Sequence, residues 1–127
     1  MKEYIFDLQK IRSLNDWWDE YINIVRGEGF EYFGKNRDAY SDSIDGGPGC
    51  PEYPCRFVFI NKGKITNPQL IEYTKIELEF KKTKCHPSWL PTIEAQLELL
   101  EKGIGENLHH WIIDPLMGRE GIEVVVK

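Results

Sequence analysis

The chain of 127 residues lacks any long apolar run and contains only three cysteines. A membrane-spanning helix needs about 20 consecutive apolar residues. The first apolar stretch, Tyr4 to Phe6, ends at once in Asp7, so it does not form the apolar core of a secretory signal. Three cysteines also give no even disulfide framework. These shortages predict a cytoplasmic protein with reduced thiols and no membrane association.

Basic residues are also scarce, because 16 lysines and arginines stand against 21 acidic residues, for a net charge of −5. The imbalance is local: residues 28–52 hold six acids and two bases, and so carry −4 of the total −5. Binding of nucleic acid requires clustered Lys and Arg. The composition therefore argues against nucleic acid as a direct partner, and it favours a basic protein surface.

Hydrophobic residues make up 41% of the chain and aromatic residues 13%, which suits one core and a single domain over residues 1–127. Strands alternate with helical stretches, which implies a parallel sheet covered by helices. The predicted fold class is α/β: a small parallel three-stranded sheet packed with helices, with an inserted strand and helix segment around residues 62–103. The apolar spacing predicts strands at 3–8, 56–61, 74–82 and 121–126, and helices at 13–26, 36–45, a short one from 67, 91–102 and 108–114.

Three of these expectations depend on particular patterns. Residues 75–81 alternate strictly between charged and apolar side chains, as in a half-exposed strand. The last strand is almost continuously apolar, so we expect it inside the sheet. Trp17 and Trp18 are adjacent on a helix, so we expect one in the core and the other at an interface or rim.

An acidic stripe follows the predicted helix at 36–45. Asp38, Asp42 and Asp45 stand at positions i, i+4 and i+7, and therefore share one helix face. Like charges at this spacing repel each other by a few tenths of a kcal/mol per pair. Spacing alone leaves open whether this is a solvated acidic face or a binding surface.

The residues around the stripe follow a longer pattern. It consists of Tyr32-Phe33-Gly34, Asn36, Asp38-Ala39-Tyr40, Asp42, Ile44 and Gly46. This pattern resembles the second helix and the preceding loop of the barstar family, which are intracellular protein inhibitors of ribonucleases. The segment from Gln9 to Leu14 is similar to the entry into the family's first helix. The likeness covers residues 3–61 well and 104–126 loosely, and residues 62–103 are largely an insertion.

The resemblance implies a barstar-like fold and the function of an immunity protein. Members of this family close the active site of a basic ribonuclease with this helix and loop, so that their carboxylates replace the substrate phosphate. By motif position, Asp42 corresponds to the central acid, Asp38 to the acid one turn earlier, and Tyr32 to the loop aromatic. The partner-binding residues that the resemblance implies are Tyr32, Phe33, Gly34, Asn36, Asp38, Ser41, Asp42, Asp45 and Gly46.

Three departures from the family pattern bear on the target. Ser41 and Gly47 stand where the best-known member has tryptophans, and Arg37 stands in place of a leucine. An arginine there would repel a uniformly basic partner. We therefore expect a nuclease different from the one that this member inhibits. The same scaffold also allows a regulatory protein-interaction module that has no nuclease target.

Two other groups of residues are weighed as metal or catalytic sites. Cys50, Cys55, Cys85 and His86 could supply three thiolates and one imidazole to zinc, but their spacing differs from a tight zinc knuckle, so we expect unpaired thiols. His109 and His110 point about 100° apart on a helix and are expected as a surface pair. No phosphate loop or nucleophile elbow occurs. The sequence thus predicts no enzyme, no cofactor and no metal.

Overall fold

Three parallel strands form the base of the fold: β1 (Lys2–Asp7), β2 (Cys55–Ile60) and β3 (Ile122–Val126). A computed structural model describes residues 1–127, and the strand order in its sheet is β1-β2-β3, with both pairs parallel. The expected parallel three-stranded α/β sheet is confirmed. The expectation that the last strand lies inside the sheet is wrong, because β3 is an edge strand. The central place belongs to β2, in which Phe57 and Phe59 are fully buried.

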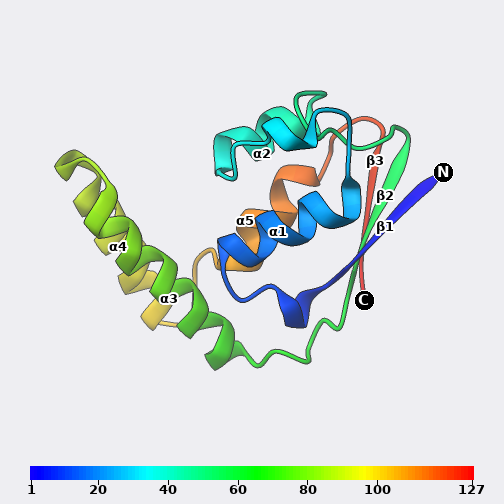
Figure 1. The fold of residues 1–127 in the computed structure, drawn as a ribbon. Helices are drawn as coiled ribbons and strands as arrows, with labels where there is room; N and C mark the ends of the chain where they lie inside the picture. Colours follow the sequence, from blue (N-terminus) through cyan, green and yellow to red (C-terminus); the bar gives the residue numbers. More distant parts are fainter.

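Five α-helices connect the strands. They are α1 (Leu14–Val25), α2 (Arg37–Ile44), α3 (Asn67–Lys84), α4 (Leu90–Glu101) and α5 (Leu108–Ile113). Figure 1 shows α1, α2 and α5 on one side of the sheet, whereas α3 and α4 form a hairpin that extends away from it. No helix combines the length and the apolar character that crossing a membrane requires.

The covered face of the sheet carries large aromatic side chains. Tyr4 and Phe6 of β1 and Phe57 of β2 are buried, and Phe6 stacks on Phe57 with ring centroids 5.5 Å apart. Trp17 of α1 meets Phe6 edge-on at 4.9 Å. Each such side chain contributes about 1.5–3 kcal/mol by leaving water, so this aromatic layer holds α1 against the sheet.

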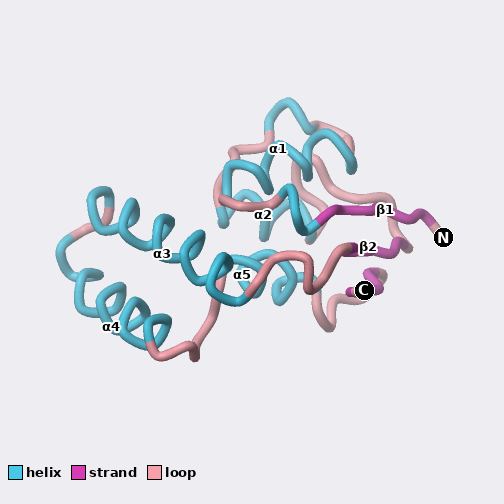
Figure 2. Tube along the Cα trace, turned by 90° about the horizontal axis from the view of Figure 1, so that it is seen from below, coloured by secondary structure: helices cyan, strands magenta, loops and turns pink.

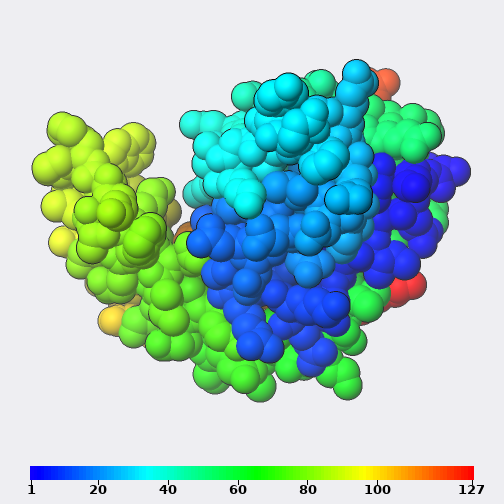
Figure 3. All heavy atoms as spheres, viewed as in Figure 1, coloured from blue at the N-terminus to red at the C-terminus, as the bar shows by residue number.

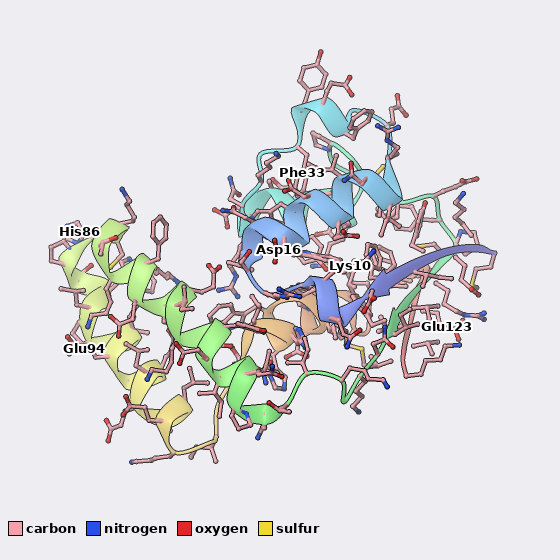
Figure 4. The ribbon with its side chains drawn as sticks, turned by 60° about the horizontal axis from the view of Figure 1, so that its bottom comes forward. Lys10, Asp16, Phe33, His86, Glu94 and Glu123 are labelled. Atoms are coloured by element: carbon pink, nitrogen blue, oxygen red, sulfur yellow. The ribbon has the colours of Figure 1, made fainter.

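No helix lies against the opposite face of the sheet (Figure 1), which is crossed by two ion pairs that share one arginine. Arg56 of β2 reaches Glu3 of β1 at 3.0 Å and Glu123 of β3 at 3.1 Å. Figure 4 shows Glu123 at this outer side of the sheet. The alternation of side chains along parallel strands places these three charged residues in one row across the sheet.

Trp17 and Trp18 are both buried, with 0% and 3% of their surface exposed, so the prediction that only one lies in the core is wrong. Trp17 packs on the sheet, while Trp18 packs on Phe33 and Tyr40, with ring centroids 6.0 and 5.8 Å away. Because α2 and its preceding loop cover a second side of α1, adjacent positions on α1 can both be enclosed.

Residues 74–82 are helical, so the predicted strand is wrong. They belong to α3, which begins at Asn67 after a capping box at Thr66. Thr74 and Leu78 are buried and four residues apart, whereas Ile76 and Phe80 are exposed. The apolar side chains thus alternate in sequence but fall on two different faces of one helix.

The α3–α4 hairpin is attached to the rest of the fold by two polar contacts. The Thr74 hydroxyl accepts a hydrogen bond from the Leu108 N–H at 2.9 Å, and the Glu77 carboxylate accepts one from the Leu14 N–H at 3.1 Å. Figure 2 shows α5 between the hairpin and the strands. The buried residues of the hairpin belong to the same apolar cluster as the residues that cover the sheet.

Candidate functional site

The candidate site begins with Asn36, which caps α2. Its side-chain oxygen accepts a hydrogen bond from the Ala39 N–H at 2.7 Å, and its amide nitrogen donates to the Gly34 carbonyl at 3.2 Å. A Cβ atom on Gly34 would lie only 3.3 Å from the Ala39 Cβ, so the loop passes close to the helix. Asn36 and Gly34, both expected to contact a partner, therefore fix the start of α2.

Two tyrosine hydroxyls hold the inner side of α2. Tyr40 donates to the Ile112 carbonyl of α5 at 2.6 Å, and Tyr21 of α1 shares a hydrogen bond of 2.8 Å with the Ser43 hydroxyl. Burial raises the pKa of Tyr40 well above its ordinary value. Burial also raises the pKa of Tyr21, although the bond to Ser43 acts in the opposite direction. Both phenols are therefore neutral at physiological pH and act as fixed links between helices.

The C-terminal end of α2 is held by a third tyrosine and by a tight turn. Tyr53 donates its hydroxyl hydrogen to the Ile44 carbonyl. Gly46 takes a left-handed φ of +105°, and the Gly47 N–H donates to the Asp42 carbonyl at 2.7 Å. A Cβ atom on Gly47 would lie 2.7 Å from the same oxygen, so only glycine fits there.

The acidic stripe divides into two free carboxylates and one paired carboxylate. Asp38 and Asp42 are exposed, and neither side chain takes part in a hydrogen bond or an ion pair. Ser41 between them is also exposed. Asp45, in contrast, pairs with Arg119. The unpaired negative charge of the acidic stripe is thus concentrated at Asp38 and Asp42, which lie one turn apart.

The two aromatic residues of the preceding loop point in different directions. Tyr32 is 77% exposed, whereas Phe33 is 7% exposed. Phe33 lies 6.0 Å from the Trp18 ring and 5.4 Å from the Tyr21 ring, and Figure 4 shows it beneath the loop. Phe33 therefore supports the loop from inside, while Tyr32 is free to contact a partner beside the acidic stripe.

Arg37 does not share the surface of the free carboxylates. Its guanidinium lies over the Trp111 ring at 5.4 Å from the centroid, and it lines a groove that neither Asp38 nor Asp42 lines. Lys35 lines the same groove and pairs with Asp19 at 3.5 Å. The positive charge of Arg37, which we expected to repel a basic partner, therefore faces away from the acidic stripe.

The four residues weighed as zinc ligands do not meet. No group of three or more His, Cys, Asp or Glu side chains is placed to hold a metal ion. Cys85 and His86 follow the end of α3 at the far end of the hairpin, where Figure 4 labels His86, whereas Cys55 begins β2 and Cys50 lies in the loop before it. All three cysteines are free.

The two adjacent histidines have different surroundings. His109 is half-buried, and its Nε2 atom lies 3.3 Å from the Ile11 carbonyl. Burial lowers its pKa below the ordinary value. His110 is exposed, and its Nδ1 atom accepts a hydrogen bond from the Asn107 N–H at 3.1 Å. The expected surface pair is correct for His110 and wrong for His109, because α5 lies between the sheet and the hairpin.

Sequence reasoning missed the residues that hold α2 in place, namely Tyr21, Ser43 and Tyr53. For Tyr21 and Ser43 the signal was present, because a tyrosine or serine in a buried helix face must find a hydrogen-bond partner. Tyr53 lies in the loop before β2, where no helical spacing marks it. Comparison with models of protein families finds no match, and comparison with curated proteins finds none either. The geometry of the site therefore indicates what it can do: it has two free carboxylates on a firmly held helix and one exposed phenol on the loop before that helix.

Proposed function

We propose that this protein is an immunity protein that inhibits a toxin, with a ribonuclease as the favoured target. In this proposal, α2 enters the basic active site of the toxin in the cytoplasm and its carboxylates take the positions of substrate phosphates. The observation that supports it best is the pair Asp38 and Asp42, exposed, unpaired and one turn apart. The resemblance of residues 32–46 to the barstar pattern points to the same function.

The physical basis of the inhibition is preorganised negative charge. Hydrogen bonds that carboxylates accept from Arg and Lys are short and strong, and they gain strength when the interface excludes water. Because three tyrosine hydroxyls and two glycines already fix α2, binding loses little conformational entropy there. The local excess of acidic residues would also accelerate the encounter with a basic protein.

The test uses the products of the reading frames that flank this one. Each product is assayed for RNA cleavage with and without this protein, and any nuclease found is titrated with the Asp42→Asn and Asp38→Asn variants. Loss of one partner of a buried charge pair costs about 2–5 kcal/mol. We therefore expect each variant to raise the inhibition constant by at least 30-fold, while Glu94→Gln, an exposed acid on α4, leaves it unchanged.

Three outcomes would contradict the proposal. Undiminished inhibition by Asp42→Asn would show that α2 does not occupy the active site. Tight binding of a flanking product without loss of any catalytic activity would favour the regulatory interaction module instead. An association rate that does not fall with added salt would contradict electrostatic steering.

A further inference from the structure

A groove of about 500 Å³ separates the α3–α4 hairpin from the body of the protein. Figure 3 shows the surface hollowed between the hairpin and the α1–α2 region. One side is formed by α1, by the loop before α2 with Lys35, and by Arg37 at the start of α2; the other is formed by α3. Helix α3 contacts α1 at Glu77 and continues to Lys84 beyond this contact. The groove lies along this continuation. It is thus a product of the 62–103 segment.

The α3 side of the groove carries two apolar side chains that are largely exposed. Ile76 and Phe80 stand one turn apart and are 58% and 63% exposed. Across from them lies Trp111, which is 8% exposed and whose indole N–H has no hydrogen-bond partner. Apolar side chains gathered on one side of a groove are typical of protein interaction surfaces.

The charge of the groove is opposite to that of the whole chain. Lys35, Arg37, Lys81 and Lys84 line it, and their positive charges stand on both of its sides. The one carboxylate that lines it, Glu77, already accepts the hydrogen bond from the Leu14 N–H. The groove is therefore a positively charged region on a chain whose net charge is −5.

We infer that this groove binds an acidic segment of a partner protein that also carries apolar side chains. Carboxylates of the segment would pair with Lys81, Lys84 and Arg37, and its apolar side chains would cover Ile76 and Phe80. A small molecule fits less well, because pockets for small ligands bury 70–90% of them, whereas both apolar residues here are more than half exposed. Nucleic acid is disfavoured because the body beside the groove is acidic.

This inference does not depend on the target of α2. The free carboxylates Asp38 and Asp42 lie outside the groove, so the two surfaces could bind different parts of one partner or different partners. A peptide that binds the groove would be acidic, whereas a peptide that binds α2 would be basic. Failure of one proposal can therefore be told apart from failure of the other.

The test is a selection from a displayed library of random twelve-residue peptides on the full chain. We expect the selected peptides to combine Asp or Glu with aromatic or aliphatic residues. Synthetic copies should lose at least tenfold in affinity for the double variants Lys81→Glu/Lys84→Glu and Ile76→Ser/Phe80→Ser. The matched control, Lys62→Glu/Lys64→Glu, makes the same change of charge outside the groove and should bind normally. Added salt should weaken binding.

Three results would overturn the inference. They are a selection that yields only basic peptides or none, equal binding by the groove variants, and tighter binding of a twelve-nucleotide RNA that competes with the peptides. Thermal unfolding checks that the exposed substitutions leave the fold intact. If a variant does unfold, a photoreactive phenylalanine in the selected peptide must cross-link to the wild-type chain at α3 or at the loop before α2; cross-links elsewhere contradict the groove.

Discussion

At the scale of single residues, the tyrosines of this chain serve as hydrogen-bonding groups as well as core residues. Tyr40 is 2% exposed, and its ring packs against Trp17, Trp18 and Tyr21. A buried hydroxyl without a partner would be costly, and Tyr40 avoids this cost by donating to the Ile112 carbonyl. The same contact fixes the distance between α2 and α5, and so helps to hold the acidic stripe in place.

The variant Tyr40→Phe should therefore destabilise the protein although it removes a single oxygen atom. It leaves the buried Ile112 carbonyl without its donor, and the expected loss in the free energy of unfolding is about 1–3 kcal/mol. Urea denaturation measures it. Tyr32→Phe makes the same chemical change at an exposed position and should alter stability by less than about 0.5 kcal/mol. Equal effects of the two variants would show that the hydrogen bond from Tyr40 to the Ile112 carbonyl does not stabilise the fold.

At the scale of elements, α3 shows how two periodicities can overlap in one stretch. Residues 75–81 alternate between charged and apolar, which fits a strand with Ile76, Leu78 and Phe80 on one face. The helix instead buries Leu78 together with Thr74, and leaves Ile76 and Phe80 exposed. The helical period becomes visible only when Leu70, Ile71 and Thr74 are included, and Lys and Glu in this stretch also favour helix over strand.

Alanine substitutions in α3 separate these two arrangements. Leu78→Ala should lower the free energy of unfolding by about 2–5 kcal/mol, because it removes a side chain that is 2% exposed in the core. Ile76→Ala should change it by less than about 0.5 kcal/mol, because Ile76 is 58% exposed. Chemical denaturation of both variants gives the comparison. Similar losses at the two positions would favour one shared apolar face, as in a strand.

At the scale of the whole molecule, buried titratable groups predict how stability depends on pH. Burial raises the pKa values of Tyr4, Tyr21, Tyr40 and Tyr53 above the ordinary value of 10.0. Above that pH the unfolded chain loses these protons while the folded chain keeps them. The free energy of unfolding should therefore fall as the pH rises beyond about 10.

The acidic side of the same profile depends on His109. Its pKa lies below the ordinary value of 6.5, chiefly through burial, so the unfolded chain gains this proton first as the pH falls. Stability should then decline as the pH falls below about 6.5. Urea denaturation between pH 5 and pH 11 measures both limbs. His109→Gln, which keeps a donor for the Ile11 carbonyl, should flatten the acidic limb alone; an unchanged acidic limb would contradict this assignment.

The sequence by itself determined the α/β class, the parallel sheet and the acidic helix, because these depend on local signals. Apolar runs predicted all three strands of the sheet, and apolar spacing predicted a helix at 36–45, where the structure has α2. The motif around Asp38 and Asp42 marked the candidate surface before any contact was known. Each of these signals lies within a few residues along the chain.

Only the tertiary structure decided which of these residues are free. It buried Phe33, paired Asp45 with Arg119, and left Asp38 and Asp42 exposed. It also turned Arg37 toward Trp111 and placed α3 so that a basic groove lies beside an acidic helix. These outcomes depend on contacts between segments far apart in sequence, and local patterns carry no information about which distant side chain will cover or pair with a given residue.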